Sequence, residues 1–269
     1  MAEDEGAWRG ILAPFNQGQL VIHGRPGGKM IRLEVYDTRA STLRELSAAF
    51  GGRVEGFNAE AVTVRANAPR RPLCIGNAVG ILDEHGSWPA KKPRPEVILH
   101  IASAMAFGTG EHATTATCLR FLSQEAARCA PGWKCLDLGT GSGILAIAAE
   151  KFGAAEVHAM DYDTRAVRAA RANARRNRCR RVRITAGDIM TWKPARAKYR
   201  LVLANMFSSV LCAAAAQISR AVAPGGCLML SGILHTQEDE VRHAFSSANM
   251  RPDQAARRGK WVTLLLRPR

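Results

Sequence analysis

The chain has 269 residues, 47% apolar and 23% charged, which excludes an intrinsically disordered protein and fits one large domain, or an ordinary domain with a smaller one. Its formal net charge of +15 favours polyanionic partners, and its longest apolar runs, 144–149 and 211–216, are far too short to span a bilayer. The seven cysteines are scattered without a CxxC spacing, so we expect neither a disulfide framework nor a structural zinc site, and we expect a reducing cytoplasm as the location.

The N-terminal part of the chain predicts a small α+β domain. It begins with the acidic, polar residues MAEDEGAW, so we expect no signal peptide. Apolar and polar residues alternate over 30–36, as in a half-buried strand, and Ser41 can cap a helix that precedes a short strand at 54–57. Residues 66–95 are rich in proline, glycine and charge, which is typical of a connector. We therefore divide the chain into an N-terminal domain at 1–65, a connector at 66–95 and a main domain at 96–269.

Strands and helices alternate from Glu96 onward, which predicts an α/β domain with a parallel sheet covered on both faces. The last candidate strand follows a loop with arginine and glycine and can be antiparallel. The candidate strands are Val97–Ile101, Lys134–Leu138, Glu156–Asp161, Arg181–Thr185, Leu201–Asn205, Cys227–Ser231 and Trp261–Leu266. The candidate helices are Thr114–Ala130, Ile144–Phe152, Arg165–Arg178, Val210–Val222 and Glu238–Ala248.

The segment 134–150, KCLDLGTGSGILAIAAE, carries the strongest functional signal in the sequence. An apolar strand runs into Gly139, Gly141 and Gly143 and then into an apolar helix. The glycines have no side chains to block a ligand, and the helix start offers free N–H groups. Such a turn at the carboxyl end of a parallel strand predicts a pocket for a nucleotide-like ligand. The alternative is a tight strand–helix turn without a ligand.

The acidic residues near this turn favour S-adenosyl-L-methionine over a dinucleotide. Asp137 precedes the glycines, whose spacing is GxGxG rather than GxGxxG, and Asp161 ends the next strand. S-adenosylmethionine has no pyrophosphate, so it tolerates a carboxylate near the turn. Asp137 leaves poor room for a dinucleotide pyrophosphate, which disfavours an oxidoreductase. We therefore predict Asp137 and the three glycines as cofactor-binding residues.

Polar residues at the ends of later strands complete the predicted site. Asp161 can accept hydrogen bonds from both ribose hydroxyls, or it can cap the next helix, a role that Asp163 can also fill. Asp188 can accept a hydrogen bond from an adenine amino group, or it can be a cap or turn residue. Asn205 ends the strand LVLAN, where its carbonyl oxygen can hold an amine and align its lone pair with a sulfonium methyl group. The alternative for Asn205 is a simple strand-end turn.

Residues 106–115, AFGTGEHATT, predict a flap ahead of a helix that begins near Thr114. Phe107 can pack on a flat group of the ligand. His112 lies beside Glu111, but no second histidine or acid stands at a metal-ligand spacing. We therefore expect a structural role for His112 and no metal site.

Five segments in chain order, AFGTGEHATT, LDLGTGSGILAIAA, VLANMF, PGGCLMLSGIL and GKWVTLLL, resemble the ribosomal protein L11 methyltransferases, the PrmA family. The resemblance covers about 72–269. Its most specific part is the FGTGxHxTT element, because other class I methyltransferases share only the glycine turn.

The resemblance implies a seven-stranded, Rossmann-like class I methyltransferase sheet with a small N-terminal α+β domain. It implies S-adenosyl-L-methionine as the cofactor and transfer to lysine side-chain or α-amino nitrogens of a ribosomal protein, with L11 as the suspected partner. In the family the N-terminal domain recognises the protein substrate, whereas here the residues before Arg71 are few and weakly similar. By position, the residues that would contact the cofactor or the acceptor are Phe107, Thr114, Gly139, Asp161 and Asn205.

The arginine-rich segment 165–183 holds nine arginines and no acid. It predicts either a phosphate-binding face near RNA or the ribosome, or a solvated helix face. No aromatic residues are interleaved, which disfavours base stacking. Two other functions stay open beside the ribosomal-protein methyltransferase: a related methyltransferase with another protein or RNA target, and a non-catalytic binding module on the same fold.

Overall fold

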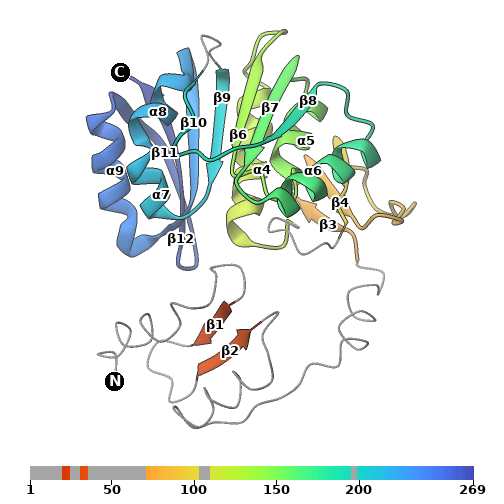
Figure 1. Ribbon diagram of the computed structural model, residues 1–269. Helices are drawn as coiled ribbons and strands as arrows, with labels where there is room; N and C mark the ends of the chain where they lie inside the picture. The colour runs from red at the N-terminus through yellow and green to blue at the C-terminus, as the bar shows by residue number, and fades with distance from the viewer. Residues whose placement is uncertain (1–19, 25–30, 36–70, 103–109, 195–198) are drawn as a thin grey trace. The chain divides into compact units, whose positions relative to one another are not determined.

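The computed structural model describes residues 20–24, 31–35, 71–102, 110–194 and 199–269, and the chain divides into two compact units, Met1–Arg65 and Ala66–Arg269 (Figure 1). In the first unit, β1 (Leu20–Gly24) and β2 (Ile31–Val35) pair as antiparallel strands. β2 confirms the strand predicted at 30–36. The predicted helix from Ser41 and the predicted strand at 54–57 lie outside the described residues.

The second unit is built on a seven-stranded sheet with the order β11-β12-β10-β9-β6-β7-β8 (Figure 1). Neighbours from β8 to β10 are parallel, and β12 runs antiparallel to both β10 and β11. These pairings confirm the predicted α/β sheet and the antiparallel last strand. The strands are β6 (Lys134–Leu138), β7 (Glu156–Asp161), β8 (Val182–Ala186), β9 (Tyr199–Asn205), β10 (Val222–Leu234), β11 (Met250–Arg258) and β12 (Trp261–Pro268).

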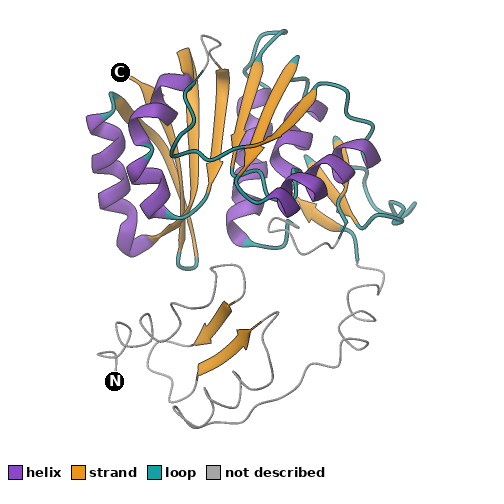
Figure 2. Ribbon diagram, in the orientation of Figure 1, coloured by secondary structure: helices purple, strands orange, loops and turns teal. Residues whose placement is uncertain are grey.

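Helices cover both faces of this sheet, as predicted (Figure 2). Successive residues of β9 show the two faces: Leu201 and Leu203 belong to one apolar core with α4, α5 and α6, while Val202 and Ala204 belong to a second core with α7, α8 and α9. Burial on both faces explains why the strands are almost continuously apolar. The helices are α4 (Ala113–Ala126), α5 (Ile144–Lys151), α6 (Thr164–Arg176), α7 (Ser208–Ala213), α8 (Ala215–Ala221) and α9 (Glu238–Ser247). Within the described ranges, none of the helices has the length and apolarity of a membrane span.

One predicted helix, Val210–Val222, is two helices in the structure. α7 and α8 meet at Ala214, whose φ of −99° and ψ of 7° lie outside the regular helix. The prediction also ran one residue too far, because Val222 pairs with Tyr199 and begins β10. Apolar periodicity continues across the break, so it could not reveal the irregular backbone at Ala214.

The predicted connector at 66–95 contains two strands and is therefore wrong in its described part. β3 (Leu73–Ile75) and β4 (Val79–Leu82) form a hairpin, and β5 (Val97–His100) pairs with β4 in parallel. Trp88 folds back so that its ring lies against Gly80, where a Cβ atom would come within 2.3 Å of it. Four of the eight proline and glycine residues of 66–95 belong to the loop between β4 and β5, and Gly80 lies within β4 itself.

The strand predicted at Val97–Ile101 exists as β5, but it belongs to the small sheet and not to the main one. The seventh strand of the main sheet is β11, which the sequence analysis missed. Most of β11 is exposed, and its register shifts between Pro252 and Gln254, so it shows no alternation of apolar and polar residues. An edge strand tolerates such a sequence because one side of it pairs with no neighbour.

Candidate functional site

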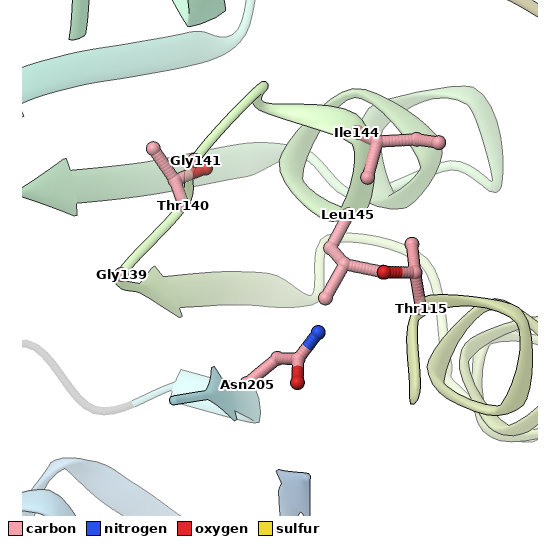
Figure 3. A pocket seen from close by; sticks show the side chains of 7 residues that line it. All are labelled: Thr115, Gly139, Thr140, Gly141, Ile144, Leu145 and Asn205. Atoms are coloured by element: carbon pink, nitrogen blue, oxygen red, sulfur yellow. The ribbon is translucent and has the colours of Figure 1, made fainter. Parts of the chain in front are cut away.

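A pocket opens where the carboxyl ends of β6 and β9 meet the start of α4 (Figure 3). It joins three segments that are far apart in the sequence: the glycine turn, the end of the strand LVLAN and the threonines of the predicted flap. Figure 3 shows the Asn205 side chain directed toward Leu145 and Thr115. The lining residues are Thr115, Gly139, Thr140, Gly141, Ile144, Leu145 and Asn205.

The glycine turn has the backbone geometry that its sequence predicts. Gly139, Gly141 and Gly143 have φ angles of +68°, +55° and +82°, in the left-handed region that other residues adopt only with strain. Gly143 is also the N-cap of α5, and a Cβ atom there would lie 3.0 Å from Cβ of Ala170. Two of these glycines line the pocket, whereas Gly143 serves the close packing of α5 against α6.

Asp161, at the end of β7, holds the glycine turn. Its Oδ2 accepts a hydrogen bond from the main-chain N–H of Gly141 at 2.8 Å, and its Oδ1 accepts one from the N–H of Asp163 at 3.0 Å. The N-cap of α6 is Asp163, which accepts from the N–H of Arg165 at 2.8 Å. The helix-capping alternative for Asp161 is therefore wrong. Each of its carboxylate oxygens keeps a second lone pair for a ligand.

Asp137 lies beneath the turn and does not line the pocket. Its side chain is 1% exposed, and its Oδ2 accepts hydrogen bonds from the Thr140 hydroxyl at 2.5 Å and from the N–H of Ala146 at 3.2 Å. Burial raises the pKa of Asp137 to about 7; the two hydrogen bonds lower it, and the charge of Asp161 raises it further. The sequence predicts Asp137 as a cofactor-binding residue, but in this position its side chain stabilises the turn from inside the protein.

Asn205 is oriented by a chain of hydrogen bonds that starts at α4. His112 is the N-cap of α4, and its Nδ1 lies 2.7 Å from the hydroxyl oxygen of Thr114. Burial, with a smaller effect of the Lys260 charge, lowers the pKa of His112. The imidazole is therefore neutral at neutral pH, and Nδ1 can accept. The Thr114 oxygen in turn accepts from Nδ2 of Asn205 at 3.4 Å. This chain fixes the amide so that its carbonyl oxygen remains to accept a hydrogen bond, and it gives His112 the structural role that was predicted.

Thr115 is the pocket residue that the sequence analysis missed. It lines the pocket and is 1% exposed, and its hydroxyl has no hydrogen-bond partner among the described residues. Thr114, which was predicted as a contact, is also 1% exposed and faces His112 and Asn205 instead. The sequence predicts that the pair of threonines stands at the start of a helix, but it does not predict the rotation of the helix start that decides which of them meets the pocket.

Asp188 adopts the turn geometry that was its alternative role, since its Oδ1 accepts from the N–H of Met190 at 2.8 Å. Its Oδ2 makes no hydrogen bond with the described residues, so this geometry leaves a cofactor contact open. Phe107 lies outside the described residues, so its predicted contact keeps the status of a prediction.

Three large apolar side chains are strongly exposed within the described ranges, and each follows a predicted site residue. Tyr162 is 79% exposed directly after Asp161, and Met190 and Phe207 are 49% and 68% exposed two residues after Asp188 and Asn205. Exposed apolar groups that gather at one edge of a sheet indicate a surface that meets a ligand or a partner. Their exposure could not be read from the sequence.

Most of this chain is similar in sequence to proteins of one family. Residues 65–269 match the family described as "Ribosomal protein L11 methyltransferase (PrmA)". The ribosomal protein L11 methyltransferase of Ralstonia nicotianae is 39% identical over 261 residues, which cover 90% of this chain and 83% of the relative. That of Symbiobacterium thermophilum is 38% identical over 197 residues, which cover 72% of this chain and 62% of the relative.

Solved structures agree with this grouping. The ribosomal protein L11 methylase of Lactobacillus delbrueckii subsp. bulgaricus is 28% identical, with a TM-score of 0.65 over 74% of this chain and 99% of the other. An S-adenosylmethionine-dependent methyltransferase of Clostridium acetobutylicum is only 11% identical and shares the fold, with a TM-score of 0.50 over 59% of this chain and 93% of the other. The chain therefore has the class I methyltransferase fold and belongs to the ribosomal protein L11 methyltransferase (PrmA) family.

Proposed function

We propose that this protein transfers methyl groups from S-adenosyl-L-methionine to lysine side-chain or α-amino nitrogens of ribosomal protein L11. The observation that carries the proposal is that the glycine turn after β6 and the Asn205 amide after β9 line one pocket. A cofactor site and an acceptor site that share a pocket are what direct transfer between two bound molecules requires. The names of the relatives support L11 as the protein substrate.

The residues present fit the cofactor. The buried hydroxyl of Thr115 has no partner among the described residues, which favours a polar ligand there, since buried polar groups in proteins are almost always hydrogen-bonded. Asp161 holds the ribose hydroxyls through its remaining lone pairs, and Oδ2 of Asp188 accepts from the adenine amino group. When bound, the cofactor supplies an electrophilic methyl group on a sulfonium. Asp137 acts on the cofactor indirectly, by fixing the turn through Thr140 and Ala146.

The acceptor amine is held by Asn205. Because Nδ2 of Asn205 donates to Thr114, the carbonyl oxygen accepts an N–H of the amine and directs its lone pair toward the methyl group. The exposed ring of Phe207 offers an apolar surface for the methylene groups of a lysine. A free lysine has a pKa of about 10.4, and desolvation lowers it, so the neutral amine forms without a dedicated base.

The N-terminal unit, Met1–Arg65, is proposed to select the protein substrate. It is compact and separate from the catalytic unit by its internal contacts, which suits a recognition domain. Since the proposed substrate is a ribosomal protein, we propose the cytoplasm as the place of reaction. A related protein or RNA target is the alternative that the test below decides.

The test is to incubate the full chain with methyl-labelled S-adenosylmethionine and an equimolar set of isolated ribosomal proteins, and to locate the label by mass spectrometry. We expect label on L11, on lysine or α-amino nitrogens. A chain without residues 1–65 serves as the comparison and should bind the cofactor but leave L11 unlabelled. Label on another protein, or on added ribosomal RNA instead, would overturn the assignment of the substrate.

A further inference from the structure

α6 presents a line of arginines to solvent. Its buried side consists of Ala166, Val167, Ala170, Asn173 and Ala174. Arg165, Arg168, Arg171 and Arg175 recur at intervals of three or four residues on the other side, and all four are exposed. Because a helix rises about 5.4 Å per turn, this spacing puts one guanidinium group on each successive turn.

The arginine-rich surface continues beyond the helix into the turn that follows it. Arg178, Arg180 and Arg181 are exposed in the turn that leads from α6 to β8, the edge strand (Figure 1). Arg183 on β8 alternates with Ile184, which packs against α6, so Arg183 faces the other side of the sheet and is not part of this surface. The side chain of Arg171 donates to the carbonyl oxygen of Ile184 on β8 at 2.7 and 3.1 Å. This contact joins the arginine side of α6 to β8, so the helix and the turn form one surface.

Only part of this positive charge is neutralised. Arg165 pairs with Asp163 at 3.2 Å, and Arg176 pairs with Glu84 at 2.6 Å. Glu150 accepts from the main-chain N–H groups of the turn and leaves the arginine side chains there unpaired. No hydrogen bond or ion pair to a described residue involves the side chains of Arg168, Arg175, Arg178, Arg180 and Arg181, which we call the arginine face.

We propose that the arginine face binds the phosphate backbone of structured RNA. Five guanidinium groups on one exposed surface, without a partner among the described residues, repel one another unless a polyanion neutralises them. Arginine forms two parallel hydrogen bonds to a phosphate, which suits it to this role better than lysine. The choice of RNA rests on the proposed function, because a ribosomal protein meets RNA wherever it is assembled.

The composition of the arginine face distinguishes RNA from other anionic partners. No large apolar side chain is exposed between residues 163 and 183, which are all described. An interfacial membrane helix needs such residues for insertion, and protein interfaces rely on apolar and aromatic anchors. The absence of aromatic rings in this range also disfavours base stacking. Contacts to phosphates in a double-stranded region, independent of base sequence, are what remains.

The location of the arginine face allows RNA and the cofactor to bind together. α6 begins directly after Asp163 at the carboxyl edge of the sheet and runs back toward the opposite edge. None of the residues that line the pocket belongs to α6 or β8. RNA on this surface would therefore hold the enzyme near its substrate without closing the pocket.

The test compares two variants of the full chain that lose the same charge. Arg168→Gln, Arg175→Gln and Arg178→Gln are combined in one variant, and Arg120→Gln, Arg251→Gln and Arg258→Gln in the control. All six arginines are exposed, and the control residues lie on α4 and β11. Arg171 and Arg176 are left in place because their side chains contact β8 and Glu84. The probe is a fluorescent 20-base-pair RNA duplex, measured by anisotropy between 50 and 200 mM salt.

For the wild type and the control we expect affinity for the duplex to fall steeply with salt. Three lost phosphate contacts make the log–log slope of the face variant shallower by about 2.7, so its fall in affinity over this range is smaller by roughly 40-fold. Equal slopes for the two variants, or no duplex binding by the wild type at 50 mM salt, would overturn the proposal. Binding of the same variants to phosphatidylserine vesicles is measured as well. A face variant that loses binding to the vesicles but keeps its binding to the duplex would also overturn the proposal.

Methylation of isolated L11 without RNA separates this inference from the proposed function. The face variant should methylate L11 at the wild-type rate and bind S-adenosylmethionine with unchanged affinity by calorimetry. If L11 is methylated but the duplex does not bind through the arginine face, this inference alone fails. If the duplex binds there but L11 is not methylated, the proposed function fails, and with it the reason for choosing RNA of the ribosome.

Discussion

The main-chain N–H of Gly141 donates a 2.8 Å hydrogen bond to Oδ2 of Asp161, which links the glycine turn after β6 to the end of β7. The carboxylate that we assign to the ribose therefore also fixes the backbone that surrounds the cofactor. This double use explains why a change at Asp161 should affect binding more than the loss of one contact.

Asp161→Ala should weaken binding of S-adenosylmethionine by roughly 1.5–3 kcal/mol, the range for hydrogen bonds to a charged group. Isothermal titration calorimetry measures the effect. Asp163→Ala is the control, because the Asp163 carboxylate caps α6 and pairs with Arg165 but does not line the pocket. The control should lower stability by about 1 kcal/mol and leave cofactor affinity unchanged. Unchanged affinity in Asp161→Ala would remove Asp161 from the cofactor site.

Gly141→Val should abolish cofactor binding while the chain stays folded, because the branched side chain would enter the pocket that Gly141 lines. Gly153→Val is the matched control. Gly153 has a φ of +97° and open space around its position, so it carries comparable backbone strain far from the pocket. Circular dichroism checks folding and calorimetry checks binding. Equal loss of cofactor affinity in both variants would assign the effect to strain alone.

Thr115→Val should have opposite effects on stability and binding. Valine has the shape of threonine without the hydroxyl, so the free protein should gain about 1 kcal/mol by losing an unpartnered buried group. Cofactor affinity should fall by roughly fivefold to tenfold, the scale of one neutral hydrogen bond. Thr117→Val is the control, since the Thr117 hydroxyl donates to Ala113 at 2.8 Å and its loss should only destabilise. A Thr115 variant that binds the cofactor normally would contradict the role of this hydroxyl.

Asp137→Asn should remove a pH dependence of folding stability. The pKa of Asp137 is raised from 3.8 in the unfolded chain to about 7, so the folded state holds its proton more tightly. This contribution to stability is full below about pH 4 and is lost as pH rises toward 7, with a slope of at most about 1.4 kcal/mol per pH unit. Urea unfolding between pH 4.5 and 7.5 should show the wild type losing stability relative to Asp137→Asn. Parallel curves would mean that Asp137 is ionised throughout.

Local backbone chemistry made the glycine turn predictable from sequence. Glycines between a strand and a helix favour positive φ angles, and Gly139, Gly141 and Gly143 have them. The position of Asp161 was predictable because it ends the next parallel strand. The choice of Thr115 over Thr114 was not predictable, because the packing of α4 against the sheet sets the rotation of the helix start.

Tertiary contacts also explain where the predicted elements differ from the structure. β11 pairs with β12 through its backbone, so its exposed side chains carry no apolar pattern. The strands β3 and β4 are so short that the prolines and glycines in and around them dominated the composition of the segment. Asp137 was predicted to contact a ligand because it precedes the glycine turn in the sequence. The sequence does not show that its side chain is buried beneath the turn and faces away from the pocket.

The central claim is that the pocket between the glycine turn and Asn205 is where the methyl group is transferred. Its most direct test measures, on Asn205→Ala and the wild type, both the affinity for S-adenosylmethionine and the single-turnover rate of methyl transfer to L11. An interaction that orients the amine acts mainly in the transition state, so we predict a rate at least 100-fold lower (about 2.7 kcal/mol) with cofactor affinity within about threefold of the wild type. An unchanged rate, or a rate and an affinity that fall by the same factor, would contradict the account.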